Sequence, residues 1–196
     1  FGLQTRYLSF FFAITTVLSF FNIIYSYYLN LYLNLHTYYY SLVISLILAI
    51  LFYKIRISEN KINIFKKILT VFLGYILLPL ILSIPFYFSI YNLSFLDSFF
   101  ESISGFTSTG FTIFSNIKNV DQGLILWRSS TQWIGGLYFL FSIIFLIDIY
   151  DENFKKTLTN FISFNNSEIL KQVTKIFLLY SALTLSIFLI LNFFSI

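Results

Sequence analysis

Hydrophobic residues along the chain come in long unbroken runs, and polar residues gather between the runs. Residues 7–53, 68–96, 129–147 and 176–196 contain no Asp, Glu, Lys or Arg. A bilayer core about 30 Å thick is crossed by about 20 helical residues. Each run is therefore long enough to span a membrane, and the first is long enough to span it twice.

The pattern predicts five membrane-spanning helices, at residues 7–29, 36–55, 68–91, 123–147 and 173–195. Only 10% of the residues are charged, against about 25% in soluble domains. The predicted fold class is an all-α polytopic membrane protein. The chain has one histidine and no cysteine, so it offers little for a catalytic or metal site. We therefore expect no enzyme, no catalytic residue and no cofactor.

Basic residues mark one side of the predicted membrane. Ten of the twelve lie at Arg6, in the connection 54–67, or in the segment 148–175. The positive-inside rule makes this side cytoplasmic. We expect a multi-pass protein of the plasma membrane, in bacteria the inner membrane, with a cytoplasmic N-terminus. The net charge of +4 then belongs to these connections, and we expect no nucleic-acid partner.

The segment 92–122 joins two spans but contains a helix signal of its own. Ser94 and Asp97 have the spacing of a capping box, which predicts a short helix of about ten residues. Such a helix rises about 15 Å, half the thickness of a bilayer. We expect a half-helix that enters from outside and an extended segment that returns beside protein or a water-filled cavity.

The stretch "SISGFTSTGFTIF" (102–114) follows this helix. Gly105 and Gly110 have the G-x-x-x-x-G spacing of a phosphate-binding loop. That motif continues with Lys and then Ser or Thr, and here Phe111 stands in place of the Lys that would contact the phosphates. Glycine, hydroxyl residues and the lack of Lys or Arg favour a loop whose backbone carbonyls replace the water shell of a potassium ion. A purely structural loop, or one that binds another solute, is the alternative that this pattern leaves open.

This loop and the later stretch "LWRSSTQWIGG" (126–136) together resemble the first repeat of the TrkH/KtrB superfamily of potassium transporters. The resemblance implies four helix–pore-loop–helix repeats in one chain, each of which supplies a quarter of a potassium-channel-like selectivity filter. It assigns the parts of the chain as an N-terminal transmembrane helix pair at 1–60, the first repeat at 68–147 with its filter at 105–112, a cytoplasmic connection at 148–172, and the first helix of a second repeat at 173–196.

The resemblance also assigns the filter residues. Potassium would bind at Ser108, Thr109 and Gly110, flanked by Thr107 and Phe111. Ser108 stands where the family usually has Thr, and Phe111 where it often has a small residue. Potassium is then the transported substrate.

The same resemblance suggests which partners the protein has and whether the chain is a fragment of a longer one. It implies a homodimer in the lipid membrane and a soluble nucleotide-binding regulatory subunit on the cytoplasmic side. The chain begins without Met and stops inside an apolar run, so we expect a fragment that carries one of four pore loops. The alternative to potassium uptake is a non-transporting scaffold or a truncated product. The sequence does not distinguish a channel from a proton- or sodium-coupled symport.

Charged and small residues near the loop suggest how it is supported. Arg128 would lie inside the fourth span, where an unpaired cation costs roughly 2.5–3.5 kcal/mol on insertion. We predict an ion pair with Glu101 that braces the pore helix behind the filter, and the alternative role for Arg128 is a barrier to cations. Gly135 and Gly136 are either a hinge or a close contact between helices. Asp97 is either a helix cap or a collector of cations.

Overall fold

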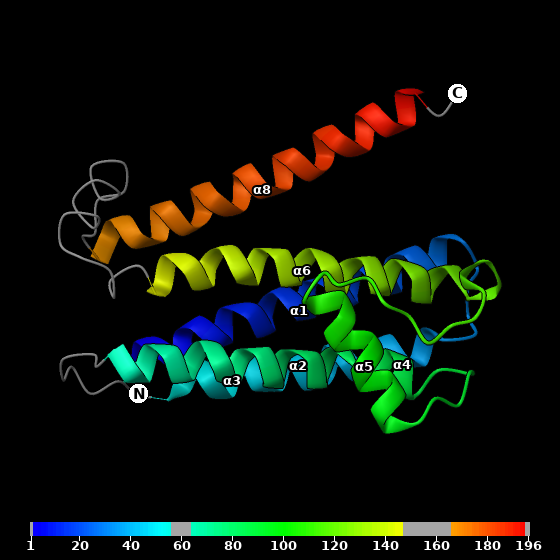
Figure 1. Ribbon diagram of the computed structural model, residues 1–196, viewed down its shortest axis with the longest axis horizontal. Coiled ribbons are helices and arrows are strands. Elements are labelled where there is room, and N and C mark those ends of the chain that lie inside the picture. Colours follow the sequence, from blue (N-terminus) through cyan, green and yellow to red (C-terminus); the bar gives the residue numbers. More distant parts are fainter. Residues whose placement is uncertain (1, 56–63, 147–165, 195–196) are drawn as a thin grey trace. The chain divides into compact units, whose positions relative to one another are not determined.

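The computed structural model describes residues 2–55, 64–146 and 166–194 (Figure 1). These residues form helices joined by turns and loops, and they include no strand. The chain falls into two compact units, residues 1–145 and residues 146–196. The first unit contains the predicted filter. The second contains α8 (Asn166–Phe194), which begins earlier than the predicted fifth span.

Helices α1 (Gly2–Tyr28) and α2 (Leu35–Lys54) form an antiparallel pair, close to the two spans predicted at 7–29 and 36–55. Their contact is made by small hydroxyl side chains: Ser9 Oγ donates to the carbonyl of Ala49 at 2.7 Å, and Ser19 Oγ donates to Ser41 Oγ at 3.1 Å. Small polar residues let helix backbones approach closely where the surroundings offer no water.

The third predicted span is broken in the structure. The sequence predicts one span over 68–91, but α3 (Ile64–Leu82) ends at a turn at Ser83, and a separate short helix, α4 (Ile84–Tyr87), follows. The physical reason is Pro85, which has no N–H to donate and whose ring clashes with the preceding helical turn. The interruption is one residue wide, and Phe65–Tyr87 as a whole is still a candidate membrane span, so the predicted third span is present but ends at Tyr87 instead of residue 91.

The segment between the third and fourth predicted spans contains the short helix α5 (Phe95–Phe106), a turn of 3-10 helix η1 (Ile117–Asn119), and then α6 (Gln122–Leu146). The predicted cap is confirmed: Ser94 Oγ accepts from the backbone N–H of Asp97 at 3.1 Å and donates to its Oδ2 at 2.7 Å. Asp97 therefore caps the helix. Helix α5 runs at an angle to the longer helices of the unit (Figure 1).

Four helical segments are long and apolar enough to cross a membrane: Thr5–Tyr28, Leu35–Lys54, Phe65–Tyr87 and Lys175–Phe193. They coincide with four of the five predicted spans. Helix α6 coincides with the remaining one but is not among these four, and its first half carries Arg128 together with Ser, Thr and Gln residues. The protein is therefore a helical membrane protein with several spans.

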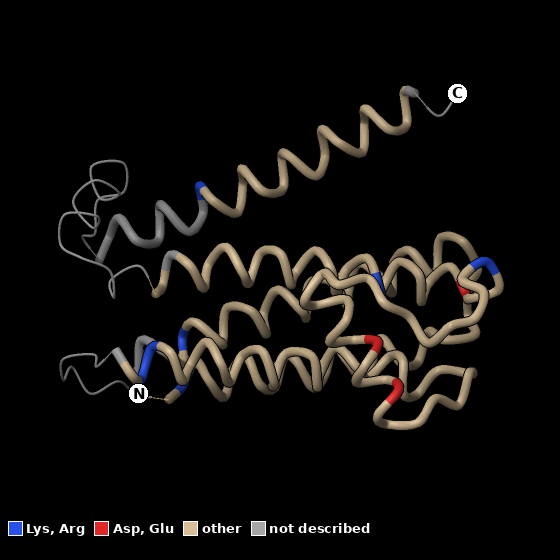
Figure 2. Tube along the Cα trace, viewed as in Figure 1, with Lys and Arg blue, Asp and Glu red and all other residues tan. Residues whose placement is uncertain are grey.

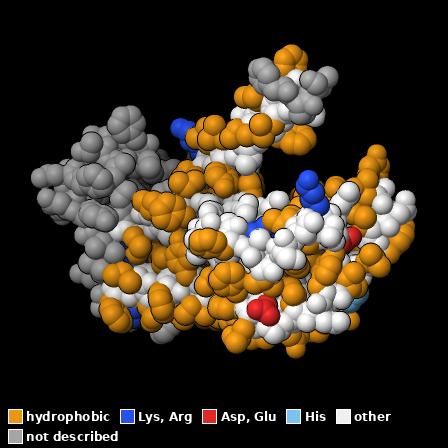
Figure 3. All heavy atoms as spheres, turned by 45° about the vertical axis from the view of Figure 1, so that its right-hand side comes forward, with side chains coloured by type: hydrophobic (Ala, Val, Ile, Leu, Met, Phe, Trp, Pro, Cys, Tyr) orange, Lys and Arg blue, Asp and Glu red, His pale blue; other side chains and the backbone are white. Residues whose placement is uncertain are grey.

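The surface of the first unit agrees with this class. Large apolar side chains are exposed along α1 and α2. Apolar side chains also cover much of the face seen in Figure 3. Apart from Lys118 and Arg128, the described basic residues of the first unit gather at one end of α1, α2 and α3, where Arg6 lies over the ring of Tyr53 (Figure 2). Apolar flanks between polar ends are what a bilayer requires.

Helices α5 and α6 touch almost backbone to backbone. A Cβ atom at Gly135 would collide with the carbonyl group and Cα of Phe106, and one at Gly105 would collide with the side chain of Thr131. Gly135 and Gly105 are both buried. This geometry favours the close-packing interpretation of Gly135 over a hinge. Gly136 is partly exposed.

Gly135→Ala should strongly reduce the stability of the folded protein. The added methyl group meets backbone atoms that cannot rotate away, and overpacking of this kind costs about 3 kcal/mol. The melting temperature and the yield of monodisperse protein in detergent measure the loss. Ser129→Ala on the exposed face of α6 is the control and should change stability by less than about 0.5 kcal/mol. Equal stability of Gly135→Ala and wild type would contradict the contact.

Candidate pore-loop site

The site begins where α5 ends. The backbone N–H groups of Thr107, Ser108 and Thr109 donate to carbonyls in the last turn of α5, at 2.8, 2.9 and 3.0 Å. Ser108 has φ 57° and Gly110 has φ 79°, both in the left-handed region that favours glycine. These two positive φ angles turn the chain out of the helix, and the chain then returns as an irregular segment toward η1.

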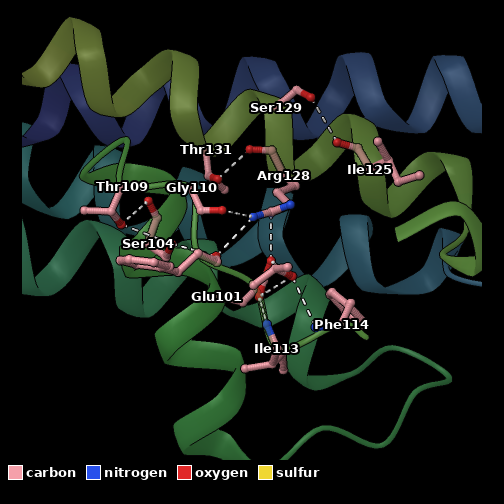
Figure 4. Close-up of polar contacts among 12 residues, drawn as sticks. Glu101, Ser104, Thr109, Gly110, Ile113, Phe114, Ile125, Arg128, Ser129 and Thr131 are labelled. Atoms are coloured by element: carbon pink, nitrogen blue, oxygen red, sulfur yellow. Dashed lines mark hydrogen bonds and ion pairs between the residues drawn. The ribbon is translucent and has the colours of Figure 1, made fainter. Parts of the chain in front are cut away.

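The backbone carbonyls of this turn fall into two groups. Within the part of the chain that the structure describes, no hydrogen bond ends on the carbonyl oxygens of Thr107, Ser108 or Thr109. All three residues are exposed. Gly110 and Phe111 are exposed as well, but their carbonyls accept from Arg128 Nη2, at 3.1 and 3.0 Å (Figure 4). The first three oxygens are therefore open to a ligand, and the last two are held by the protein.

The hydroxyl groups of the turn point back to the helix. Thr107 Oγ1 donates to the carbonyl of Ile103 at 2.8 Å, and Thr109 Oγ1 lies 3.1 Å from the carbonyl oxygen of Ser104. Ser104 Oγ donates to the carbonyl of Phe111 at 2.7 Å, so it bridges the two sides of the turn. The sequence analysis missed Ser104, because nothing in its spacing separates it from the other hydroxyl residues nearby.

Glu101 lies behind the turn, on the buried side of α5. Its carboxylate is fully buried and accepts from Thr112 Oγ1 at 3.0 Å and from the backbone N–H of Ile113 at 3.0 Å. Arg128 Nε of α6 lies 2.7 Å from Glu101 Oε1. The Nε–H does not point along that line, so the contact is an ion pair without an aligned hydrogen bond at Nε.

This arrangement joins three segments through one pair of charges. Glu101 belongs to α5, Arg128 belongs to α6, and Thr112 belongs to the returning segment. The guanidinium group connects the carboxylate on one side to two carbonyls of the turn on the other (Figure 4). Because each charge is neutralised by the other, the site presents uncharged oxygens to its surroundings. Oxygen dipoles without a fixed net charge are suited to a monovalent cation that must also leave.

Other kinds of site are not found in the described residues. No group of three or more His, Asp and Glu side chains in these ranges is placed to hold a metal ion.

Comparisons with known proteins find relatives that match parts of the chain. An uncharacterized cation transporter of Methanocaldococcus jannaschii is 38% identical over 65 residues, which are 33% of this chain and 14% of that protein. The Trk system potassium uptake protein TrkI of Halomonas elongata is 43% identical over 60 residues, 31% of this chain and 11% of that protein. The protein TrkH of Salmonella typhimurium is 32% identical over 90 residues, 45% of this chain and 19% of that protein.

These relatives extend far beyond the matched stretches, which make up between 11% and 19% of their lengths. No family model matches the chain, and no solved structure matches it significantly. The helical spans define the class, a polytopic helical membrane protein. Within that class, the matched stretches are similar to a cation transporter and to Trk system potassium uptake proteins, and they cover less than half of this chain.

Arg128→Gln should destabilise the protein severely. It leaves the buried Glu101 carboxylate without a cation, and removal of one partner of a buried pair costs about 3–5 kcal/mol. The yield of folded protein and its melting temperature in detergent measure the effect.

The double variant Glu101→Gln with Arg128→Gln separates the ion pair from other roles of Arg128. It removes both charges together, so it should melt higher than Arg128→Gln alone. If the double variant melts lower than the single variant, the carboxylate does not depend on Arg128, and the pair is not what stabilises this region.

Proposed function

We propose that the protein takes up potassium across the plasma membrane through a carbonyl-lined selectivity filter, of which residues 105–112 form one quarter. The observation that carries the proposal is the turn after α5, where the carbonyls of Thr107, Ser108 and Thr109 are open and the two that follow are held by Arg128. The names of the relatives as potassium uptake proteins support the choice of ion.

In this proposal the ion is bound by backbone oxygens. Potassium contacts the carbonyls of Ser108 and Thr109, with that of Thr107 beside them. The Gly110 and Phe111 carbonyls, whose oxygens Arg128 also contacts, complete the turn. Each carbonyl oxygen has two lone pairs, so the bond from Arg128 leaves one on Gly110 for an ion, whereas the Phe111 oxygen accepts from both Arg128 and Ser104 and serves to hold the turn. Ser108 in place of Thr changes little, because its ligand is the backbone oxygen.

The remaining features of the transporter belong to the same proposal. Three further pore loops complete the ring, so this chain carries one of four. Helix α5 enters the membrane from the outer side, opposite the basic ends of α1, α2 and α3, which makes the N-terminus cytoplasmic. A homodimer in the membrane and a soluble nucleotide-binding subunit on the cytoplasmic side are the proposed partners. The connection 148–172 expected on that side lies largely outside the described residues.

Gly110→Ala tests the filter without crowding it. An added Cβ at Gly110 meets no atom within 4 Å, so the substitution acts through φ 79° alone. A left-handed residue with a side chain costs roughly 1–2 kcal/mol, so the loop conformation becomes less stable by about that amount. We expect potassium-competed rubidium uptake into liposomes to lose selectivity over sodium while the protein remains folded.

The control is Ser108→Gly, which keeps the backbone carbonyl and removes the side chain from a left-handed position. It should retain the wild-type ratio of rubidium to sodium uptake. Equal rubidium and sodium uptake by wild-type, full-length protein would remove potassium from the proposal. An absence of any flux from folded, full-length protein would favour the scaffold alternative.

A further inference from the structure

Besides Arg128 Nε, which is ion-paired with Glu101, three buried polar atoms of the first unit make no hydrogen bond with the described part of the chain: Asn22 Oδ1, Ser26 Oγ and Tyr38 Oη. All three residues are at most 1% exposed. Buried polar groups in proteins are nearly always bonded, either to protein or to ordered water. The requirement is stricter in a membrane protein, where no bulk water reaches the helix contacts. These atoms therefore indicate a ligand within the protein.

Two of the unpartnered atoms face one point beside the first turn of α6. A Cβ atom at Gly123 would lie 2.9 Å from Tyr38 Oη, 3.0 Å from Asp121 Oδ2 and 3.3 Å from Ser26 Oγ. Helices α1 and α2 and the residue before α6 thus each direct an oxygen toward the backbone of Gly123. Asp121 is held in place, because its Oδ2 accepts from Asn34 Nδ2 at 3.2 Å and its N–H donates to Tyr91 Oη at 2.7 Å.

We propose that an internal water molecule binds beside Gly123, between α1, α2 and the start of α6. The balance of donors and acceptors identifies the ligand. Tyr38 and Ser26 each have a hydroxyl proton to donate, whereas Asp121 Oδ2 and Asn22 Oδ1 only accept. A water molecule accepts two hydrogen bonds and donates two, and well-held internal waters have two to four polar partners. A bare cation satisfies only lone pairs and leaves both hydroxyl protons without an acceptor.

In this proposal the unpartnered Asn22 Oδ1 is the second acceptor. Asn22 lies one helical turn from Ser26 on the same face of α1, and its Nδ2 already contacts Ser130 Oγ of α6 at 3.3 Å. The water thus extends a direct contact between α1 and α6 by one turn. Its role is to join the N-terminal helix pair to the beginning of the helix that carries Arg128. This inference goes beyond the proposed transport function and does not depend on it.

The test asks whether removing each hydroxyl group lowers or raises the melting temperature. If Tyr38 and Ser26 bind a water, Tyr38→Phe and Ser26→Ala each break a hydrogen bond. Each should then lower the melting temperature of the full-length protein in detergent by roughly 2–4 °C. If no ligand is bound, each substitution removes an unsatisfied buried group, and the melting temperature should rise. A rise for both variants overturns the proposal.

Tyr40→Phe is the matched control, because Tyr40 lies on the same helix with about half of its surface exposed. It should not shift the melting temperature. Gly123→Ala adds a methyl group among the oxygens of Tyr38, Asp121 and Ser26 and leaves no room for a water between them. In that background Tyr38→Phe should no longer lower the melting temperature, because the bond to the water has already been lost. A further drop equal to that seen in the wild-type background would contradict a shared site.

Salt exchange distinguishes water from an ion. The wild-type melting temperature should be the same in sodium, potassium and choline chloride at equal ionic strength. A rise in sodium or potassium that disappears in Gly123→Ala would place a cation there and overturn the water. A high-resolution structure of the full-length protein should show one peak about 2.7–3.2 Å from both Tyr38 Oη and Ser26 Oγ. An empty position beside Gly123 in that structure would overturn the proposal directly.

Discussion

The buried carboxylate of Glu101 is the constraint on which this region of the protein depends. A charge without solvent is tolerated only when an opposite charge and hydrogen-bond donors surround it. Here the cation comes from α6 and the donors come from the segment after the turn, at Thr112 and Ile113. Satisfying one carboxylate therefore brings together three parts of the chain, and the same guanidinium group reaches the two carbonyls of Gly110 and Phe111.

Small residues also hold α5 and α6 together, beside the ion pair. Gly105 and Gly135 allow α5 to end directly against the backbone of α6, so the first residue of the turn is placed by backbone contact as well as by side chains. Trp127 of α6 is fully buried and donates to the carbonyl of Leu82 at 3.0 Å, where α3 ends. The exposed turn is thus supported on its inner side by α3 and α6, which hold its backbone in one arrangement.

The sequence was most informative where charge is scarce. In a chain with so few charged residues, Arg128 has few available partners, and the expected neighbour Glu101 is the residue that the structure places beside it. The spans and the cap at Ser94 were accessible for a similar reason, since long apolar runs and capping boxes are local patterns. Contacts that depend on the path of the chain were not accessible: Ser104 on the carbonyl of Phe111, Arg128 on the carbonyl of Gly110, and the oxygens around Gly123.

The order of Glu101 and Arg128 along the chain has a consequence for biosynthesis. The ribosome releases α5 with its carboxylate before it releases α6 with the cation that neutralises that carboxylate. Until α6 has been made, α5 carries an uncompensated charge that the lipid phase rejects. The carboxylate of α5 therefore gains its partner only when α6 has been made. Assembly of this region is in this sense a late step that waits for a single arginine.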